Sequence, residues 1–287
     1  MATTRLYALL ARKAPVAVIF RRGPSKQVAL VHWDLARDRF TVGQWLKGRI
    51  YERRCDLSPS GDRLIYFAAR WKGPHQSWTA VSRPPWLTAL TLWPKGDAWG
   101  GGGLFPSENL IGLNHPRHQF VVDGREPPKR VKVEQYVGRG GGEDFPIWQT
   151  RLELDGWRPT NDGSRIEHPY GETKIWIEYD PPMTFARPSP RKGGPMLEMR
   201  IRGIKERDGA WWVTDYAVVA GDEAQVLRNC DWADWDRHGD LLFARDGKVF
   251  RASHRTVGGD LSRAKELIDL SGLKFTERVS PPEARRW

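Results

Sequence analysis

The stretch DLSPSGDRLIYFA, residues 56–68, recurs later in the chain in shortened form as DWDRHGDLLFA, residues 234–244. In both copies an aspartate stands five residues before a glycine, a second aspartate follows that glycine, and a short β-type run ends in Phe-Ala. A turn followed by a strand, reused at a distance along the chain, is typical of proteins built from repeated β-sheet blades. The two copies therefore predict an architecture, and they carry no chemistry of their own.

The composition fits a soluble globular protein made of many short elements. The chain has 287 residues, of which 39% are hydrophobic and 28% are charged, well away from the composition of disordered chains. Its 29 Gly and 21 Pro favour turns over long helices. Its 15 Trp each bury a large area and need a partner for the indole N–H. The length allows one large all-β domain or two ordinary domains.

A formal net charge of +11 and a pI of about 9.8 make the chain basic. Such a charge attracts polyanions, acidic partners and anionic surfaces at long range. No run of five basic residues occurs, and we interpret the stretch KGRIYERR, residues 47–54, as a solvated connecting strand. We therefore expect the charge to be spread over the surface, with nucleic acid as an open but not favoured partner.

The two cysteines and the N-terminal stretch indicate where in the cell the protein is located. Cys55 and Cys230 are too few for a disulfide framework or a four-cysteine zinc site, so we expect buried free thiols. Arg12 and Lys13 interrupt the apolar stretch 6–20, which does not resemble an export signal. No apolar run approaches the length of a membrane span. These features predict a cytoplasmic protein that does not associate with membranes.

The pattern of short apolar runs predicts successive units of four strands. Residues 5–46 and 55–93 each contain four β-rich runs separated by turn-forming residues. Units of about 45 residues with four strands match the blades of a β-propeller. A third unit begins within residues 97–105. Further along, the Pro- and Gly-rich segment 181–195 predicts a loop, the apolar spacing in 260–270 predicts a helix, and residues 273–279 are a candidate closing strand.

The distance between the two copies gives a blade count. Asp56 and Asp234 are 178 residues apart, which is four steps of about 45 residues. We predict an all-β propeller of five blades, within a range of four to six, each a four-stranded antiparallel sheet. It would form a single domain over residues 1–287, with an irregular insertion within about 115–195.

The first copy resembles a known repeat. SPSGDRLIYFA, residues 58–68, is similar to the Ser-Pro-x-Gly-x-x-Leu signature of TolB-like and WD-type bacterial β-propeller repeats. In those families this turn joins the innermost strand of a blade to the second strand. The second copy keeps the aspartate and the glycine but has Asp236-Arg237 in place of Ser58-Pro59. The resemblance implies a propeller fold of uncharacterised function and transfers no active site.

Two irregular stretches are the candidates for ligand binding. In WPKGDAWGGGGLF, residues 93–105, consecutive glycines could approach a ligand closely or form an anion-binding nest, with a lysine nearby for phosphate. Alternatively, these glycines belong to a crowded innermost strand. In SWTAVSRPPW, residues 77–86, aromatic rings and an arginine could stack on a sugar, a base or a peptide, or the tryptophans could pack between blades. The candidate ligand-binding residues are Trp78, Arg83, Lys95, Asp97, Trp99, Gly100 and Gly101.

Catalysis and metal binding have weaker signals. Asp56, Asp97 and Asp231 lie near the starts of plausible blades and are weak candidates for acid–base catalysis, as are the nearby acids Asp144, Asp234 and Asp236. Aspartates at strand starts also commonly cap turns. His115 and His118 lack a third nearby ligand, so we predict no metal site and no cofactor.

The sequence leaves three functions open. The preferred hypothesis is a binding or interaction module for an acidic or aromatic-stacking ligand, either an unidentified protein or a small anionic molecule. Its ligand would lie on the axial face, which we expect to carry both residues 77–86 and residues 95–103. The first alternative is a propeller hydrolase that acts on a glycan or phosphoester through aspartates in the central funnel. The second is non-specific binding of nucleic acid.

Overall fold

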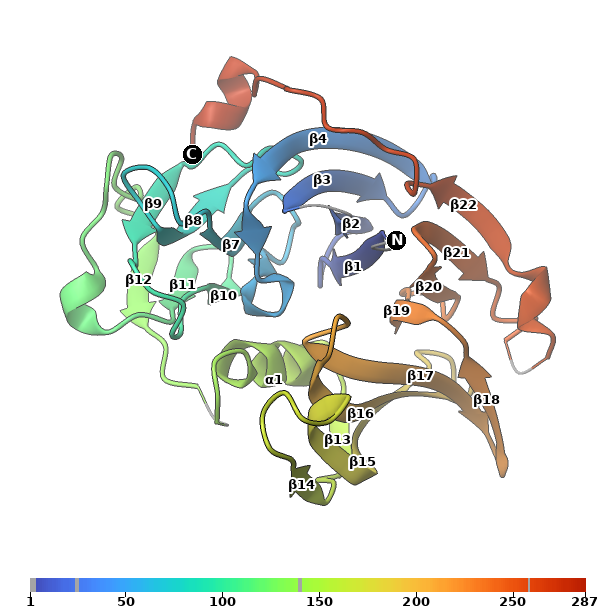
Figure 1. The fold of residues 1–287 in the computed structure, drawn as a ribbon. Helices are drawn as coiled ribbons and strands as arrows, with labels where there is room; N and C mark the ends of the chain where they lie inside the picture. The colour runs from blue at the N-terminus through green and yellow to red at the C-terminus, as the bar shows by residue number, and fades with distance from the viewer. Residues whose placement is uncertain (1–3, 24–25, 139–140, 258) are drawn as a thin grey trace. The chain divides into compact units, whose positions relative to one another are not determined.

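The computed structural model describes residues 4–23, 26–138, 141–257 and 259–287, and it is all-β as predicted. The chain divides into two compact units. The first comprises Met1–Asp155 together with Gly272–Trp287, and the second comprises Gly156–Ser271. Five β-sheets are formed by the described residues, three in the first unit and two in the second (Figure 1).

The first sheet is an antiparallel meander that confirms the four strands predicted in residues 5–46. Its strands are β1 (Arg5–Leu10), β2 (Val16–Arg22), β3 (Gln27–Asp34) and β4 (Arg39–Lys47), paired in chain order. The apolar run of β2 is buried on both faces, whereas β4 alternates between exposed and half-buried positions. Burial therefore decreases from β2 to the edge strand β4, as is expected when one edge of a sheet lies near solvent.

The second sheet confirms the strands predicted in residues 55–93 and adds an interruption. β5 (Arg49–Ile50) and β6 (Asp56–Leu57) both pair with β7 (Leu64–Ala69), and β8 (Ser77–Ser82) and β9 (Thr91–Pro94) follow in order. A single 3-10 turn at Glu52–Arg54 separates β5 from β6. The edge strand of this sheet is therefore broken at the basic stretch.

The third sheet departs from the predicted antiparallel blade. It has three strands, β10 (Gly103–Ser107), β11 (Leu110–Leu113) and β12 (Lys132–Gln135), and β12 runs parallel to β11. The long connection over residues 114–131 brings the chain back to the same end of the sheet, as a parallel pairing requires. The apolar run FVVDG at 120–124 contributes only an isolated bridge from Asp123 to Leu92.

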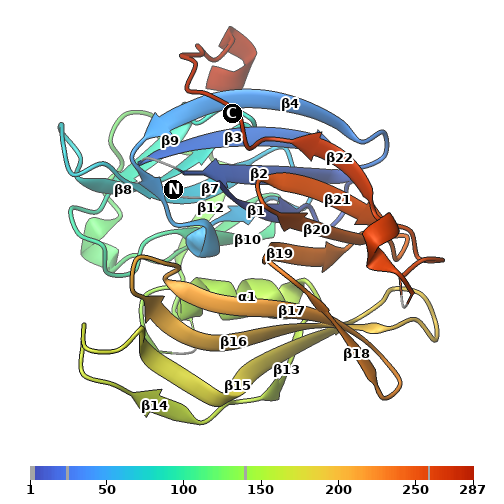
Figure 2. The same ribbon diagram turned by 45° about the vertical axis from the view of Figure 1, so that its right-hand side comes forward.

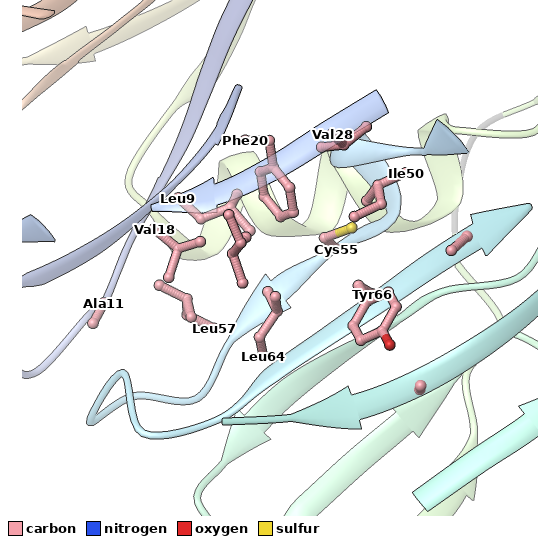
Figure 3. Close-up of a cluster of buried hydrophobic side chains, with 13 residues drawn as sticks. Leu9, Ala11, Val18, Phe20, Val28, Ile50, Cys55, Leu57, Leu64 and Tyr66 are labelled. Carbon is pink, nitrogen blue, oxygen red and sulfur yellow. The ribbon is translucent and has the colours of Figure 1, made fainter. Parts of the chain in front are cut away.

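Apolar side chains join the sheets of the first unit. Leu9, Val18 and Phe20 from the first sheet pack against Leu57 and Leu64 from the second (Figure 3). A further cluster joins the second sheet to the third, with Ile65, Val81, Leu90 and Trp93 on one side and Phe105, Ile111, Leu113 and Val131 on the other. The second sheet is thus packed on both faces.

The helix α1 (Phe145–Leu154) lies in a region for which the sequence predicted only irregular structure. Its buried positions are Ile147, Trp148, Arg151 and Leu152. One of these is an arginine, so the apolar spacing that identifies an amphipathic helix is broken at a buried position. Among the described residues no helix is both long enough and apolar enough to cross a membrane.

The second unit begins with a sheet of six strands. They are β13 (Arg158–Asn161), β14 (Arg165–Glu167), β15 (Ile175–Pro188), β16 (Met196–Glu206), β17 (Trp212–Ala220) and β18 (Glu223–Leu227). The prediction of a loop over 181–195 is wrong in its first half, because β15 continues through Pro181 and Pro182. The pairing of β15 with β16 shifts register between Glu178 and Met183, and prolines are tolerated in a strand at such an irregularity.

The last sheet is a four-stranded antiparallel meander and corrects a predicted helix. It contains β19 (Cys230–Trp235), β20 (Leu241–Arg245), β21 (Lys248–Ala252) and β22 (Lys265–Asp269) (Figure 2). Only Leu261–Arg263 forms a helical turn, and the residues after it pair with β21. Ladder hydrogen bonds to β21 outweigh the local helical spacing. Residues 273–279 form no strand.

The two copies of the repeated stretch form the same kind of turn. In the first, Ser58 and Arg63 close a turn between β6 and β7, and in the second, Asp236 and Asp240 close a turn between β19 and β20 that is shorter by one residue. Gly61 and Gly239 occupy the left-handed position, with φ values of 81° and 82°, which only glycine adopts freely. The shared sequence therefore encodes a turn, as predicted.

Replacing Leu64 with alanine is expected to lower the free energy of unfolding by about 2–5 kcal/mol, because its fully buried side chain joins the first two sheets. The matched control is Leu154→Ala at the end of α1, where the side chain is 46% exposed, and we expect a loss below about 1 kcal/mol. Urea denaturation followed by circular dichroism measures both. Equal losses would contradict the packing described above.

Candidate ligand-binding site

Asp56, a catalytic candidate, is a buried structural anion. Its carboxylate accepts the backbone N–H of Phe105 at 2.7 Å and the guanidinium of Arg12 at 3.1 Å, and it forms an ion pair with Arg151. Its side chain is fully buried. A carboxylate that is buried and held by three donors has no free face for a substrate.

The basic stretch 47–54 is solvated strand only at its start, where Lys47 and Arg49 are exposed, and it is buried at its end. Arg54 is buried, pairs with Asp144 and Glu143, and donates to the carbonyl oxygens of Ala98 and Gly100 at 2.6 Å each. A buried guanidinium needs several acceptors at once, and a local sequence pattern does not reveal partners that lie far along the chain. Asp144, also considered a candidate acid, is thereby assigned to the same network.

The glycine loop is folded around Arg54 and does not form an open anion nest. Gly101 donates its N–H to the carbonyl of Asn114 at 2.9 Å, and Gly102 donates to the hydroxyl of Thr79 at 2.8 Å. A Cβ on Gly101 would lie 2.4 Å from the ring of Phe67. The backbone donors that a nest would offer to an anion are therefore already used, and glycine is required by close packing.

Lys95, Asp97 and Trp99 form a connected group on the loop that follows β9. The ammonium of Lys95 donates to Asp97 Oδ1 at 2.7 Å, and the same oxygen accepts the backbone N–H of Trp99 at 2.8 Å. The Lys95 side chain is 4% exposed, the Asp97 side chain is 46% exposed and Trp99 is 70% exposed. The loop thus presents an indole to solvent beside a lysine–aspartate pair.

His115 lies behind this group and carries no charge at neutral pH. Its Nε2 is 2.8 Å from the hydroxyl of Thr79, which in turn accepts the N–H of Gly102. Burial and the nearby charge of Lys95 lower the pKa of His115 to about 4. Lys95 and Asp97 therefore form a neutral pair with a neutral imidazole behind it.

Trp71 is a second exposed indole, which the sequence did not single out. It is 51% exposed and lies in the left-handed region with φ of 58°, a rare conformation for a bulky residue. Its loop closes through the carbonyl of Gln76, and the next residue, Ser77, accepts the backbone N–H of Lys95 at 3.0 Å. The loops that carry Trp71 and Trp99 therefore share a base. A tryptophan directly before the turn-forming Lys-Gly-Pro was the available signal.

We expected Trp78 and Arg83 to lie together with the glycine loop, but only Trp78 lies at the same end of β8 as that loop. They lie at the two ends of β8, because the β8–β9 register pairs Trp78 with Pro94 near Lys95 and places Arg83 beyond the far end. Trp78 packs against the core between the first two sheets. Arg83 donates instead to the carbonyl of Arg286 at 2.7 Å.

The remaining candidate acids lie in the second unit. Asp234 pairs with Arg187, and Asp236 pairs with Arg251 and accepts two backbone N–H groups of its own turn. Asp231 is half-buried in β19. Within the described residues no group of three or more His, Cys, Asp and Glu side chains could hold a metal ion. Asp234 and Asp236 thus have the capping and pairing roles that the sequence left open.

Both cysteines are buried free thiols, as predicted. Burial raises the pKa of Cys55 and of Cys230 well above the ordinary value of a thiol. Cys55 Sγ lies 3.1 Å from the carbonyl of Tyr51, and its side chain is part of the core cluster in Figure 3. These thiols are suited to packing and not to nucleophilic chemistry.

No protein-family model matches the chain, and no curated protein sequence matches it either. The site is therefore characterised by its own residues.

Asp56→Asn is expected to destabilise the protein by about 3–5 kcal/mol, because it leaves Arg12 and Arg151 without their buried counter-charge. Asp62→Asn, a matched change at an exposed position of the same turn, should alter stability by no more than about 0.5 kcal/mol. Thermal and urea unfolding measure both. If Asp56→Asn were as stable as the parent protein, the ion pairs of Asp56 with Arg12 and Arg151 would not be needed to stabilise the fold.

Gly101→Ala tests the packing of the glycine loop. Gly96 is the control, because both residues have similar positive φ values, but nothing lies within 4 Å of a Cβ at Gly96. Gly96→Ala should cost only the left-handed strain, about 1 kcal/mol. Gly101→Ala should cost about 1–3 kcal/mol more, because of the clash with Phe67. Equal unfolding free energies for the two variants would mean that the loop is loosely packed.

Proposed function

We propose that the chain is a five-bladed β-propeller binding module that recognises a polyhydroxylated ring, such as a sugar, through Trp99, Lys95 and Asp97. The observation that carries this proposal is the solvent-exposed indole of Trp99, fixed beside a neutral lysine–aspartate pair. We propose binding and not catalysis through Asp56, since this candidate acid is held in a buried network.

The propeller arrangement is supported by the sheets and by the repeated turn. Five sheets follow one another along the chain, and the three sheets in the first unit pack in succession. Two of the five have the expected four antiparallel strands. The turns at 58–63 and 236–240 each join the first strand of a sheet to the second, which is the position expected for the TolB-like and WD-type signature. After the second unit, residues 272–287 return to the first.

The chemistry of the loop favours a neutral polar ligand over an anion. Lys95 has three donors, and Asp97 is its only side-chain partner within the described residues. The half-exposed carboxylate supplies acceptors next to these donors. Adjacent hydroxyl groups of a sugar can accept from an ammonium and donate to a carboxylate at the same time, whereas an anion would be repelled by Asp97. Of the two ligand types that the sequence left open, this site fits the aromatic-stacking one.

Trp99 supplies the apolar surface on which a ring can lie. An indole gives a large rigid contact area at a small cost in conformational entropy. The Trp99 backbone is held by Asp97, and the carbonyl of Asp97 accepts the hydroxyl of Ser77 at 2.5 Å. The loop of Trp71 starts from the same base, so a second indole can widen the platform.

The test is titration of the protein with maltotriose, cellotriose and chitotriose, followed by tryptophan fluorescence and calorimetry. We expect at least one of these sugars to bind, and Trp99→Ala and Lys95→Met each to weaken that binding by about tenfold or more. Trp211→Ala, at a 39% exposed indole in the second unit, is the matched control and should leave affinity unchanged.

Inorganic phosphate and AMP test whether the site binds an anion or a nucleobase instead of a sugar. Inorganic phosphate and AMP should bind more weakly than the sugar. Binding of AMP that depends on Trp99 and exceeds that of every sugar would show that the platform recognises a base. Sugar binding that Trp99→Ala leaves intact would place the site elsewhere.

A further inference from the structure

Four arginines gather around the C-terminal segment of the first unit, at the opposite end of β8 from Trp99. We call Arg83, Arg125, Arg285 and Arg286 the arginine surface. Arg83 donates to the carbonyl of Arg286, and Arg125 donates to the carbonyl of Arg285, both at 2.7 Å. The last three are exposed and Arg83 is half-buried. From Ser77 to Ser82 the strand spans about 17 Å, so this surface is separate from the loop of Trp99.

The arginine surface is held in place by the segment that it surrounds. Residues 272–287 follow the outer strands of the first unit and end near β9 (Figure 1). Trp287 donates its indole N–H to Thr91 at 3.0 Å and packs against the core cluster of Trp93. Ser280 bonds to Thr88 at 2.8 Å, and its carbonyl accepts two nitrogens of Arg285. The segment and the guanidinium groups of Arg83, Arg125 and Arg285 are thus held in place, which lowers the entropy cost of binding.

None of the four arginines forms an ion pair with any residue in the described part of the chain. Among the described residues, each has guanidinium N–H groups with no acceptor, and the Arg286 side chain donates to none. Glu126 and Glu283 stand beside them in sequence, but the segments 125–132 and 278–287 together hold seven Lys and Arg against these two acids. The surface therefore keeps an excess of positive charge.

The charge of the whole chain is concentrated in the unit that carries this surface. The first unit holds 28 Lys and Arg against 16 Asp and Glu, a net charge of +12, and the second holds 18 against 19, a net charge of −1. Five ion-paired arginines of the first unit do not contribute to the excess. Arg12, Arg22, Arg53, Arg54 and Arg151 are matched by Glu52, Asp56, Glu143, Asp144 and Asp155.

We infer that the arginine surface docks an acidic polypeptide segment, in which Asp or Glu alternates with aliphatic residues. Guanidinium forks recognise carboxylates in a bidentate geometry. Val121 and Val279 are 71% and 74% exposed and stand four residues before Arg125 and six residues before Arg285 in the sequence. Exposed aliphatic side chains on the same stretches of chain as arginines fit a peptide better than a nucleic acid, for which aromatic stacking platforms are typical. This surface does not depend on the sugar site proposed above.

The test measures fluorescence anisotropy of a short labelled peptide that alternates Glu and Leu, titrated with the full chain at low salt. We expect binding that weakens steeply as salt rises. Arg286→Glu should weaken it several-fold, and Arg125→Gln combined with Arg286→Glu by about tenfold or more. Arg286 makes no side-chain contact that the fold requires, so the single variant should unfold at the temperature of the parent protein.

Arg255→Glu is the matched control, because Arg255 is an exposed arginine of the second unit and the change in total charge is the same. It should leave the affinity for the peptide nearly unchanged. An equal loss in Arg255→Glu would show that only total charge matters, and absence of binding at low salt would overturn the inference. A single-stranded oligonucleotide of equal charge that binds more tightly than the peptide, through the same arginines, would identify nucleic acid as the partner and refute the peptide.

Discussion

The buried carboxylate of Asp56 is the interaction on which the first unit depends. It lies in β6, accepts the N–H of Phe105 in β10, and is paired with Arg12 after β1 and with Arg151 in α1. Three sheets and the helix therefore meet at one anion. Because a buried charge is tolerated only when its partners are all in place, this aspartate fixes the positions of the elements around it. The repeated stretch begins with an aspartate. This structural requirement is a better explanation for that aspartate than a catalytic role.

The sequence predicted the elements that local chemistry determines. Strands β1–β4 and β6–β9 are apolar, β-rich runs bounded by turn-forming residues, and the turns at Gly61 and Gly239 need a left-handed residue. The misassigned elements depend on distant partners. The residues of β22 have helical spacing but pair with β21, and β15 passes its prolines at a register shift. The helix α1 buries an arginine that pairs with Asp56, 95 residues away, as well as with the nearby Asp155. Local patterns carry no information about such partners.

The candidate site was predicted in part, for the same reason. Lys95, Asp97 and Trp99 are close in sequence, so their grouping could be inferred from the chain alone. The glycines beside them suggested an anion nest, but their donors are used by Asn114 and Thr79, and their neighbouring carbonyls by Arg54. Trp71 was missed because its loop joins that of Trp99 only through the pairing of β8 with β9.

The sequence pointed to a single site for an aromatic-stacking or an acidic ligand, whereas the structure has an exposed tryptophan and a group of arginines at two different places. An aromatic-stacking ligand and an acidic partner make opposite electrostatic demands. At Trp99 the charges of Lys95 and Asp97 cancel, and His115 is neutral, so the loop favours a neutral ring. At the arginine surface the four guanidinium groups form no ion pair within the described part of the chain, and basic residues outnumber acidic ones, so an anionic partner gains from contact there. Since β8 holds these two environments at its opposite ends, a small ligand cannot span both. The two proposals together predict that the protein binds a sugar-bearing ligand and an acidic polypeptide at the same time.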